Sequence, residues 1–311
     1  MGRDLAHDAL AMIEYRDDPA VCLLGDSKQA LDRMSRTAAA AGCRVASATR
    51  IEADLEGISR CAPASAALVE LAGVADERAL TGVLDWVRHE AEGSGRRSVV
   101  SMPRSLIDLV AARAWHKRVE LLCDSDDAER TAIVSAISQR SVTRLHDISR
   151  DDGPLILQQL SEDVGRIAAI LASLSEEENA AIEGAKTGQS EDKDEPGIDA
   201  AYVRSIIRAR RLRDQFFRGG LFADPAWDML LDLFAARLEG TRVAVSSLCI
   251  AAAVPATTAL RWIKALTDRG LFVRSADPQD GRRVYIALSD EVARSLTAYL
   301  RAVQRIAPPA I

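Results

Sequence analysis

Residues 243–289 read VAVSSLCIAAAVPATTALRWIKALTDRGLFVRSADPQDGRRVYIALS, and this stretch decides most of the fold. It opens with a short helical pattern that Ser246 or Ser247 can cap and that a Val-Pro pair interrupts. A second helical pattern follows and stops at Gly270, because glycine readily adopts the left-handed conformation that ends helices. Two strand patterns then flank a charged turn, Asp277–Gly281. Helix, turn, helix and hairpin together predict a winged helix-turn-helix.

The strands of the hairpin are expected at Leu271–Arg274 and Val284–Leu288. In the second helix, spacings of three and four residues separate an apolar face from a polar one. We expect the apolar face (Ala259, Trp262, Ile263 and Leu266) to be buried, and Thr257, Thr258, Arg261 and Lys264 to face outward.

This stretch resembles the MarR-type winged-helix transcription regulators, without gaps, from about Val243 to Ser289. Packing and recognition positions of that family match Leu248, Val254, Thr258, Arg261, Leu266 and Gly270-Leu271. The family's wing signature is similar to Asp277-Pro278-x-Asp280-x-Arg282 followed by Leu288-Ser289. Two positions depart from the pattern, since Ala253 replaces the usual turn glycine and Pro255 the usual capping serine. The resemblance implies a dimeric regulator that binds double-stranded DNA.

A helix in the major groove and a wing beside it need short polar and basic side chains. We expect Thr257 and Thr258 to reach bases or phosphate, and Arg261 to address guanine edges. Arg282 is expected to enter the minor groove, with Asp280 orienting it. The other positions are expected to contact phosphate or lie at the helix ends. The whole expected interface is Ser246, Ser247, Pro255, Ala256, Thr257, Thr258, Arg261, Lys264, Arg274, Arg282 and Arg283. A winged helix used for protein contacts is the alternative.

Charge is distributed unevenly along the 311 residues. Residues 201–311 hold 17 basic and 10 acidic residues, a net charge of +7, whereas residues 1–200 hold 23 and 36, a net charge of −13. A basic C-terminal module on an acidic chain is typical of a DNA-binding domain tethered to another domain.

Residues 19–140 alternate short apolar runs with helical patterns, which predicts a parallel sheet covered by helices on both faces. We expect strands at Ala20–Leu24, Arg44–Ala48, Ala66–Leu71, Ser98–Met102 and Val119–Cys123, with helices at Ser27–Ala41 and Glu77–Glu92.

The spacing of these elements resembles a response-regulator receiver domain, with a flavodoxin-like fold. That family needs a pair of acids, a phosphoacceptor aspartate and a lysine. Here Gly25-Asp26 supplies one acid, Glu70 stands at the phosphoacceptor position, and Cys123-Asp124 stands where the lysine belongs. We therefore expect a degenerate receiver-like domain that is not phosphorylated and that offers a regulatory or dimerisation surface, bound by a protein partner or by its own dimer mate.

Residues 153–178 contain an apolar stripe, at 157–174, with alternating spacings of three and four. Residues 176–199, after the stripe, hold nine acids against two lysines. The stripe predicts either a short coiled coil or an amphipathic helix packed on the first domain. The acidic stretch predicts a flexible linker. As a dimer seam, the stripe consists of Leu157, Leu160, Val164, Ile167, Leu171 and Leu174.

Two further helices are expected around the winged domain, at Tyr202–Phe217 and Asp290–Ile306. The resemblance to MarR-type proteins places the dimer interface on these helices. The first carries a dense basic run, for which pairing with acids is favoured over contact with phosphate. Its members are Arg204, Arg208, Arg210, Arg211 and Arg213.

Catalytic and metal-binding signatures are absent from the sequence: the four histidines are isolated and no nucleophile or phosphate-loop motif occurs. Asp124, Asp126 and Asp127 are better explained as a helix cap than as a cation site. The five cysteines have no CxxC spacing, and the chain has no apolar run of membrane-spanning length and no signal-peptide pattern. We expect no cofactor, no metal, no enzymatic activity, no membrane partner and a cytoplasmic location.

The expected organisation is multi-domain: a receiver-like α/β domain (1–140), an amphipathic or coiled-coil helix (141–175), an acidic linker (176–199) and a winged-helix DNA-binding domain (200–311). The expected function is that of a homodimeric, sequence-specific transcription regulator. The alternative is a dimeric adaptor in signalling whose two domains both bind proteins and not DNA.

Overall fold

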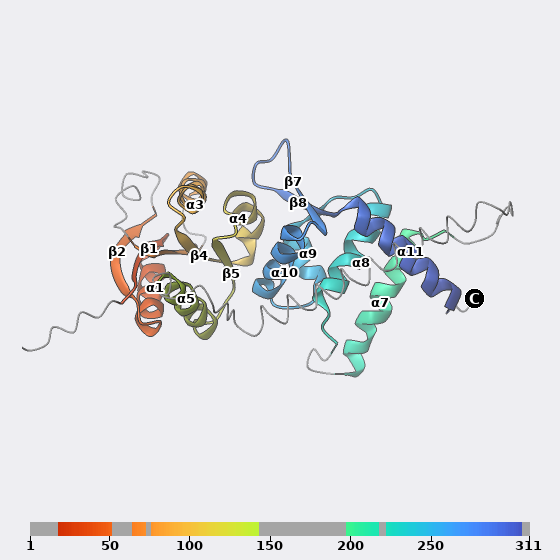
Figure 1. Cartoon of the computed structure of the whole chain (residues 1–311), viewed down its shortest axis with the longest axis horizontal. Coiled ribbons are helices and arrows are strands. Elements are labelled where there is room, and N and C mark those ends of the chain that lie inside the picture. The colour runs from red at the N-terminus through yellow and green to blue at the C-terminus, as the bar shows by residue number, and fades with distance from the viewer. Residues whose placement is uncertain (1–17, 52–63, 73–75, 143–196, 218–221, 307–311) are drawn as a thin grey trace, which may run out of the picture.

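A computed structural model describes residues 18–51, 64–72, 76–142, 197–217 and 222–306 (Figure 1). Residues 18–142 are called here the N-terminal unit, and residues 197–306 the C-terminal unit. The stripe at 157–174 and nearly all of the acidic stretch at 176–199 lie outside the described residues.

A five-stranded parallel sheet with the order β2-β1-β3-β4-β5 forms the centre of the N-terminal unit. This confirms the parallel sheet that the apolar runs predict, with each strand beginning or ending within two residues of its expected limit. Its strands are β1 (Ala20–Gly25), β2 (Arg44–Arg50), β3 (Ala66–Glu70), β4 (Arg97–Met102) and β5 (Val119–Cys123).

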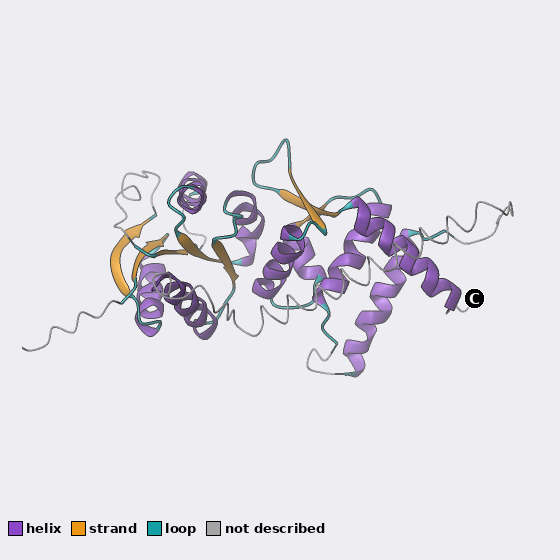
Figure 2. Ribbon diagram, viewed as in Figure 1, coloured by secondary structure: helices purple, strands orange, loops and turns teal. Residues whose placement is uncertain are grey.

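Helices cover both faces of this sheet, as Figure 2 shows. Helices α1 (Lys28–Ala40) and α5 (Asp127–Val142) pack on one face. Helices α3 (Glu77–Glu92) and α4 (Ile107–Arg113), the latter preceded by the single turn η1 (Arg104–Leu106), pack on the other. Because β5 is the last strand in the order, one of its edges is not paired with another strand.

The C-terminal unit contains a helix-turn-helix followed by a hairpin, as predicted. Helix α9 (Val245–Ala251) leads into α10 (Ala256–Asp268), and β7 (Phe272–Ala276) pairs antiparallel with β8 (Val284–Leu288). The short β6 (Val243–Ala244) adds a third strand on the far side of β8. Around this core lie α7 (Ala200–Phe216), α8 (Pro225–Leu238) and α11 (Asp290–Ile306).

Three local features differ from the sequence-based expectation. Helix α9 begins one residue before Ser246, and its N-cap Ala244 makes no side-chain bond, so neither serine caps it. Helix α8 was not expected, although Asp224 caps it and proline occupies its first turn. Ala253 has φ of 54°, which explains why a glycine is usual at this turn position in the family that the sequence resembles.

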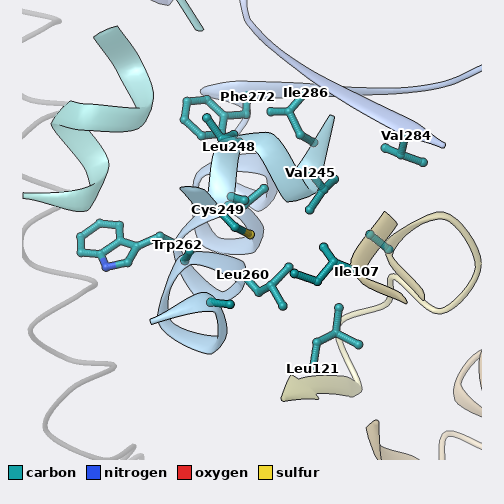
Figure 3. Close-up of a cluster of buried hydrophobic side chains, with 14 of the residues drawn as sticks. Ile107, Leu121, Val245, Leu248, Cys249, Leu260, Trp262, Phe272, Val284 and Ile286 are labelled. Atoms are coloured by element: carbon teal, nitrogen blue, oxygen red, sulfur yellow. The ribbon is translucent and has the colours of Figure 1, made fainter. Parts of the chain in front are cut away.

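The two units pack directly against each other and share one cluster of buried apolar side chains (Figure 3). The contact is made by α9, α10 and the hairpin on one side, and by α4 and β5 on the other. The sequence predicted two domains joined by a helical segment and an acidic linker, and it did not predict this contact.

Within the described ranges, no single helix is both long and apolar enough to cross a membrane. The pair α9 and α10, bent by 110°, passes the same test only when its two helices are taken together.

Candidate nucleic-acid interface

Helix α10 runs along the unpaired edge of β5. The Thr257 hydroxyl accepts a hydrogen bond from the Cys123 backbone N–H at 2.9 Å and donates one to the Cys123 carbonyl at 3.1 Å. The side chain is buried, with 1% exposed. An outward, solvent-facing Thr257 was therefore the wrong expectation: the hydroxyl substitutes for the next strand of the sheet.

Lys264 makes a second contact to the same edge, two helical turns further on. Its Nζ donates to the Val119 carbonyl at 2.8 Å, at the opposite end of β5 from Cys123. Burial lowers the pKa of Lys264 below its usual value, with Glu120 and Asp268 acting in the opposite direction. The helix rises about 10 Å from Thr257 to Lys264, and β5 rises roughly 13 Å from Val119 to Cys123. The two contacts on the helix therefore have nearly the same spacing as their partners on the strand.

Acidic side chains of the N-terminal unit contact two more expected DNA-binding residues. The Asp108 carboxylate accepts from the Ser246 backbone N–H at 2.9 Å and from its hydroxyl at 2.6 Å. The Arg261 guanidinium lies 3.9 Å from the Glu129 carboxylate, and the Arg261 side chain is 24% exposed.

The hairpin, which is the expected wing, reaches the N-terminal unit through two arginines. Arg274 donates to the carbonyls of Ala111 and Ala112, at 2.7 and 3.1 Å, in the last turn of α4, where carbonyls lack helical partners. Desolvation lowers the pKa of Arg274 below its usual value. Arg282 pairs with Glu77 at 2.5 Å between Nε and Oε1.

Apolar side chains fill the centre of this contact. Figure 3 shows Leu260 of α10 directed toward Ile107 and Leu121 of the N-terminal unit. Cys249 of α9 is buried as well, and its pKa is raised to about 12, first by desolvation and then by Cys123 and Asp108. Cys249 belongs to the same buried cluster as Ile107 and Cys123 of the N-terminal unit.

The other expected interface residues differ in exposure. Ser247 and Pro255 are exposed, Thr258 is half-buried, and Ala256 is buried. Asp280 accepts from the Arg282 backbone N–H at 3.0 Å and lies 3.4 Å from the Arg283 guanidinium. Asp280 thus holds the Arg282 backbone in the turn, while the Arg282 side chain is directed by Glu77.

At the receiver-like position, Glu70 is buried at the end of β3 and surrounded by arginines. Its Oε1 lies 3.1 Å from Arg33 Nε and 3.6 Å from an Arg130 terminal nitrogen. Desolvation raises the pKa of Glu70 above its usual value, although both arginines lower it. Two guanidinium groups therefore flank the carboxylate of Glu70.

Two remaining expectations concern charged residues. On α7, two of the five arginines of the basic run pair with acids as expected, Arg204 with Asp232 and Glu239 and Arg210 with Asp228. Arg211 and Arg213 donate to backbone carbonyls instead. Asp126 accepts from the Glu129 backbone N–H at 2.7 Å in the first turn of α5, which is the cap predicted for this acidic cluster.

No protein-family model matches the chain, and no curated protein matches it. Among solved structures it is similar to S. aureus MepR in complex with DNA, with 18% identity over 34% of this chain and 86% of that one, and a TM-score of 0.25. It is also similar to a probable transcriptional regulator from Pseudomonas aeruginosa, with 28% identity, 36% and 83% coverage and a TM-score of 0.23. A third match is the PcaV transcriptional regulator from Streptomyces coelicolor in complex with its natural ligand, with 24% identity, 38% and 86% coverage and a TM-score of 0.22.

Proposed function

We propose that this protein is a homodimeric, sequence-specific DNA-binding transcription regulator. The observation that carries the proposal is the succession of α9, a tight turn, α10 and the β7–β8 hairpin, with short polar and basic side chains along α10 and at the hairpin. Winged helices bind duplexes with this succession, placing the second helix in the major groove and the hairpin beside it. The net charge of +7 on residues 201–311 supports contact with phosphates.

Individual roles follow from side-chain chemistry. Arg261 is long enough to address guanine edges, and Thr257 and Thr258 suit bases or phosphates. Arg282 is proposed to enter the minor groove. Phosphates are the proposed partners of Lys264, Arg274 and Arg283. The starts of α9 and α10 are proposed to approach the DNA backbone through Ser246, Ser247, Pro255 and Ala256.

The N-terminal unit is proposed to be a receiver-like, flavodoxin-like module that is not phosphorylated and that binds a protein. Its strand order, which is shared by doubly wound receiver folds, supports this assignment. The ion pairs of Glu70 with Arg33 and Arg130 support the absence of phosphoryl transfer, since a lysine and Mg²⁺ are needed to neutralise the transferring group.

Dimerisation is proposed through the 157–174 stripe and through α7 and α11. Large apolar side chains exposed at the ends of these two helices support a further interface. They are Leu212, Phe216 and Phe217 on and after α7, and Ile306 on α11.

The test is the salt dependence of duplex binding by the full chain. Binding is measured by fluorescence anisotropy with a labelled duplex of about 30 base pairs, which is long enough for two half-sites one helical turn apart. Phosphate contacts release counterions, so the logarithm of the association constant should fall linearly with the logarithm of NaCl concentration. Arg282→Ala should weaken binding by about 1–3 kcal/mol, and Arg261→Ala should reduce discrimination between sequences.

Arg283→Ala is the cleaner phosphate variant, because Arg283 pairs only within its own hairpin in the described contacts, at 3.4 Å from Asp280. Arg36→Ala removes the same charge from an exposed position on α1, outside the proposed DNA and dimer contacts, and serves as the control. Equal affinities for Arg282→Ala, Arg283→Ala and Arg36→Ala would contradict the assigned interface.

One observation favours a second candidate, the adaptor that binds proteins alone. Leu260 lies in the middle of α10, is 2% exposed, and is buried by another part of the chain rather than by its own unit only. An apolar side chain at this place suits protein contact better than a base edge. Duplex binding without salt dependence, or no duplex binding at all, would favour the adaptor.

A further inference from the structure

We infer that the N-terminal unit covers the duplex-binding face of the winged helix, and that the two units must separate before a duplex can bind. The inference rests on the proposed function, since it describes how that same site is regulated. Of the eleven expected DNA-binding residues, six contact the N-terminal unit. They are Ser246, Thr257, Arg261, Lys264, Arg274 and Arg282.

The chemistry of these contacts is that of a substitute for nucleic acid. A duplex offers phosphate oxygens and base-edge acceptors to the arginines, lysine and hydroxyls of a winged helix. The N-terminal unit offers carboxylate oxygens from Glu77, Asp108 and Glu129 to three of the same side chains. Backbone carbonyls of α4 and β5 serve the rest. Each of the six residues thus directs at least one donor at the N-terminal unit, and such donors are the groups that phosphates and bases accept from.

Geometry makes the two kinds of contact mutually exclusive. The major groove is about 12 Å wide and admits little more than one helix. Helix α10 is bonded along its length to the edge of β5, at Cys123 and at Val119. A five-stranded sheet attached to this face cannot enter the groove with the helix. Binding of a duplex and closure of the two units therefore compete for α10.

The contact has features of a reversible interface. Its outer ion pairs are partly exposed: Arg282 and Glu77 have 60% and 51% of their side chains accessible, and such pairs contribute little to stability. Its apolar centre, which includes Ile107, Leu121 and Leu260, also contains Cys123 and Cys249, which are 3% and 5% exposed. These two thiols lie on opposite sides of the contact, so their reactivity reports separation independently of DNA.

The test weakens the contact from the side of the N-terminal unit and leaves every proposed DNA-binding residue unchanged. Asp108→Ala with Glu129→Ala removes the acceptors of Ser246 and Arg261. The control, Asp32→Ala with Glu92→Ala, removes two negative charges from exposed positions of α1 and α3 that no described contact joins to the C-terminal unit. All variants are full-length.

Two measurements are made on each variant. The first is the apparent Kd for a labelled duplex of about 30 base pairs at about 50 mM NaCl, a salt concentration low enough to retain phosphate contacts. The second is the rate of iodoacetamide alkylation at each cysteine, mapped by peptide mass spectrometry, with Cys22 in the sheet core as the internal reference. Closed molecules do not bind the duplex, so the apparent Kd equals the intrinsic Kd divided by the fraction of molecules that are open.

We expect the interface variant to bind the duplex about tenfold more tightly than wild type, equivalent to about 1.4 kcal/mol. Alkylation of Cys249 and Cys123 should rise by a similar factor, with Cys22 unchanged and the control variant like wild type. By reciprocity, saturating duplex should accelerate alkylation of Cys123 in the wild-type chain, because the duplex selects the open state and Cys123 lies outside the winged helix.

The inference would be overturned if the wild-type chain bound the duplex and Cys123 were alkylated no faster with DNA than without it. An interface variant whose thiols become reactive but whose duplex affinity does not change would also overturn it. A different result identifies failure of the proposed function: thiols that become reactive in the interface variant while neither it nor wild type shows salt-dependent duplex binding.

Discussion

Replacing Thr257 with valine tests the most specific contact between the two units. Valine has the shape of threonine without the hydroxyl, so the change removes both hydrogen bonds to Cys123 and little else. The Cys123 N–H and carbonyl then remain buried without these partners. A typical neutral hydrogen bond contributes about 1 kcal/mol net, and a buried polar group left unsatisfied costs about 1–3 kcal/mol. We expect the unfolding free energy to fall by about 2 kcal/mol.

Urea unfolding followed by tryptophan fluorescence is a suitable assay, because Trp115 and Trp262 lie in the two units on either side of the contact. With a slope of about 2 kcal/mol per molar urea, the midpoint should fall by about 1 M. Thr258→Val is the matched control, since this half-buried neighbour has no recorded bond across the contact, and its midpoint should change by less than about 0.3 M.

Thr257→Ser provides the rescue, because serine keeps a hydroxyl that can both donate and accept. Its midpoint should stay closer to that of wild type than the valine variant does. If Thr257→Val and Thr258→Val unfold at the same urea concentration, the Thr257 hydroxyl does not satisfy the edge of β5, and the reasoning about this contact is refuted.

Three further predictions concern other parts of the chain. Burial lowers the pKa of Lys264 in the folded chain below its value in the unfolded chain, so the free energy of unfolding should rise as pH increases toward about 10.5. The rise in the urea midpoint between about pH 8 and about pH 10 should be smaller in Lys264→Met than in wild type. Equal rises in the two proteins would contradict this prediction. Acetyl phosphate with Mg²⁺ should leave the intact mass unchanged because arginines surround Glu70, and one phosphoryl group mapped to Glu70 or Asp26 would disprove this. If the 157–174 stripe is a dimer seam, Val164→Asp with Leu171→Asp should convert a dimer to a monomer in sedimentation velocity, whereas a wild-type chain that is already monomeric would show that the stripe does not join two copies.

Local patterns in the sequence were sufficient for the elements of both units. Period-two and period-3.6 spacings depend only on neighbouring residues, so β8 and α3 were predicted with the limits that the structure shows. Trp262 was expected in the core on the same basis, and it is 8% exposed. Helix α8 was missed although Asp224 and Pro225 mark its start, because its run PAWDMLLDLF is apolar around most of the helix and only Asp228 and Asp232 form a narrow polar face.

The sequence by itself therefore determined the parallel sheet, the helix-turn-helix with its hairpin, and the unequal charge of the two parts of the chain. It could not determine what faces the polar side of α10, because threonine, arginine and lysine suit water, phosphate or the edge of a sheet equally well. Only the tertiary structure decided that Thr257 and Lys264 bond to β5, more than 130 residues earlier in the chain. The reason is that an edge strand offers backbone donors and acceptors to whatever packs beside it, whatever its own side chains are.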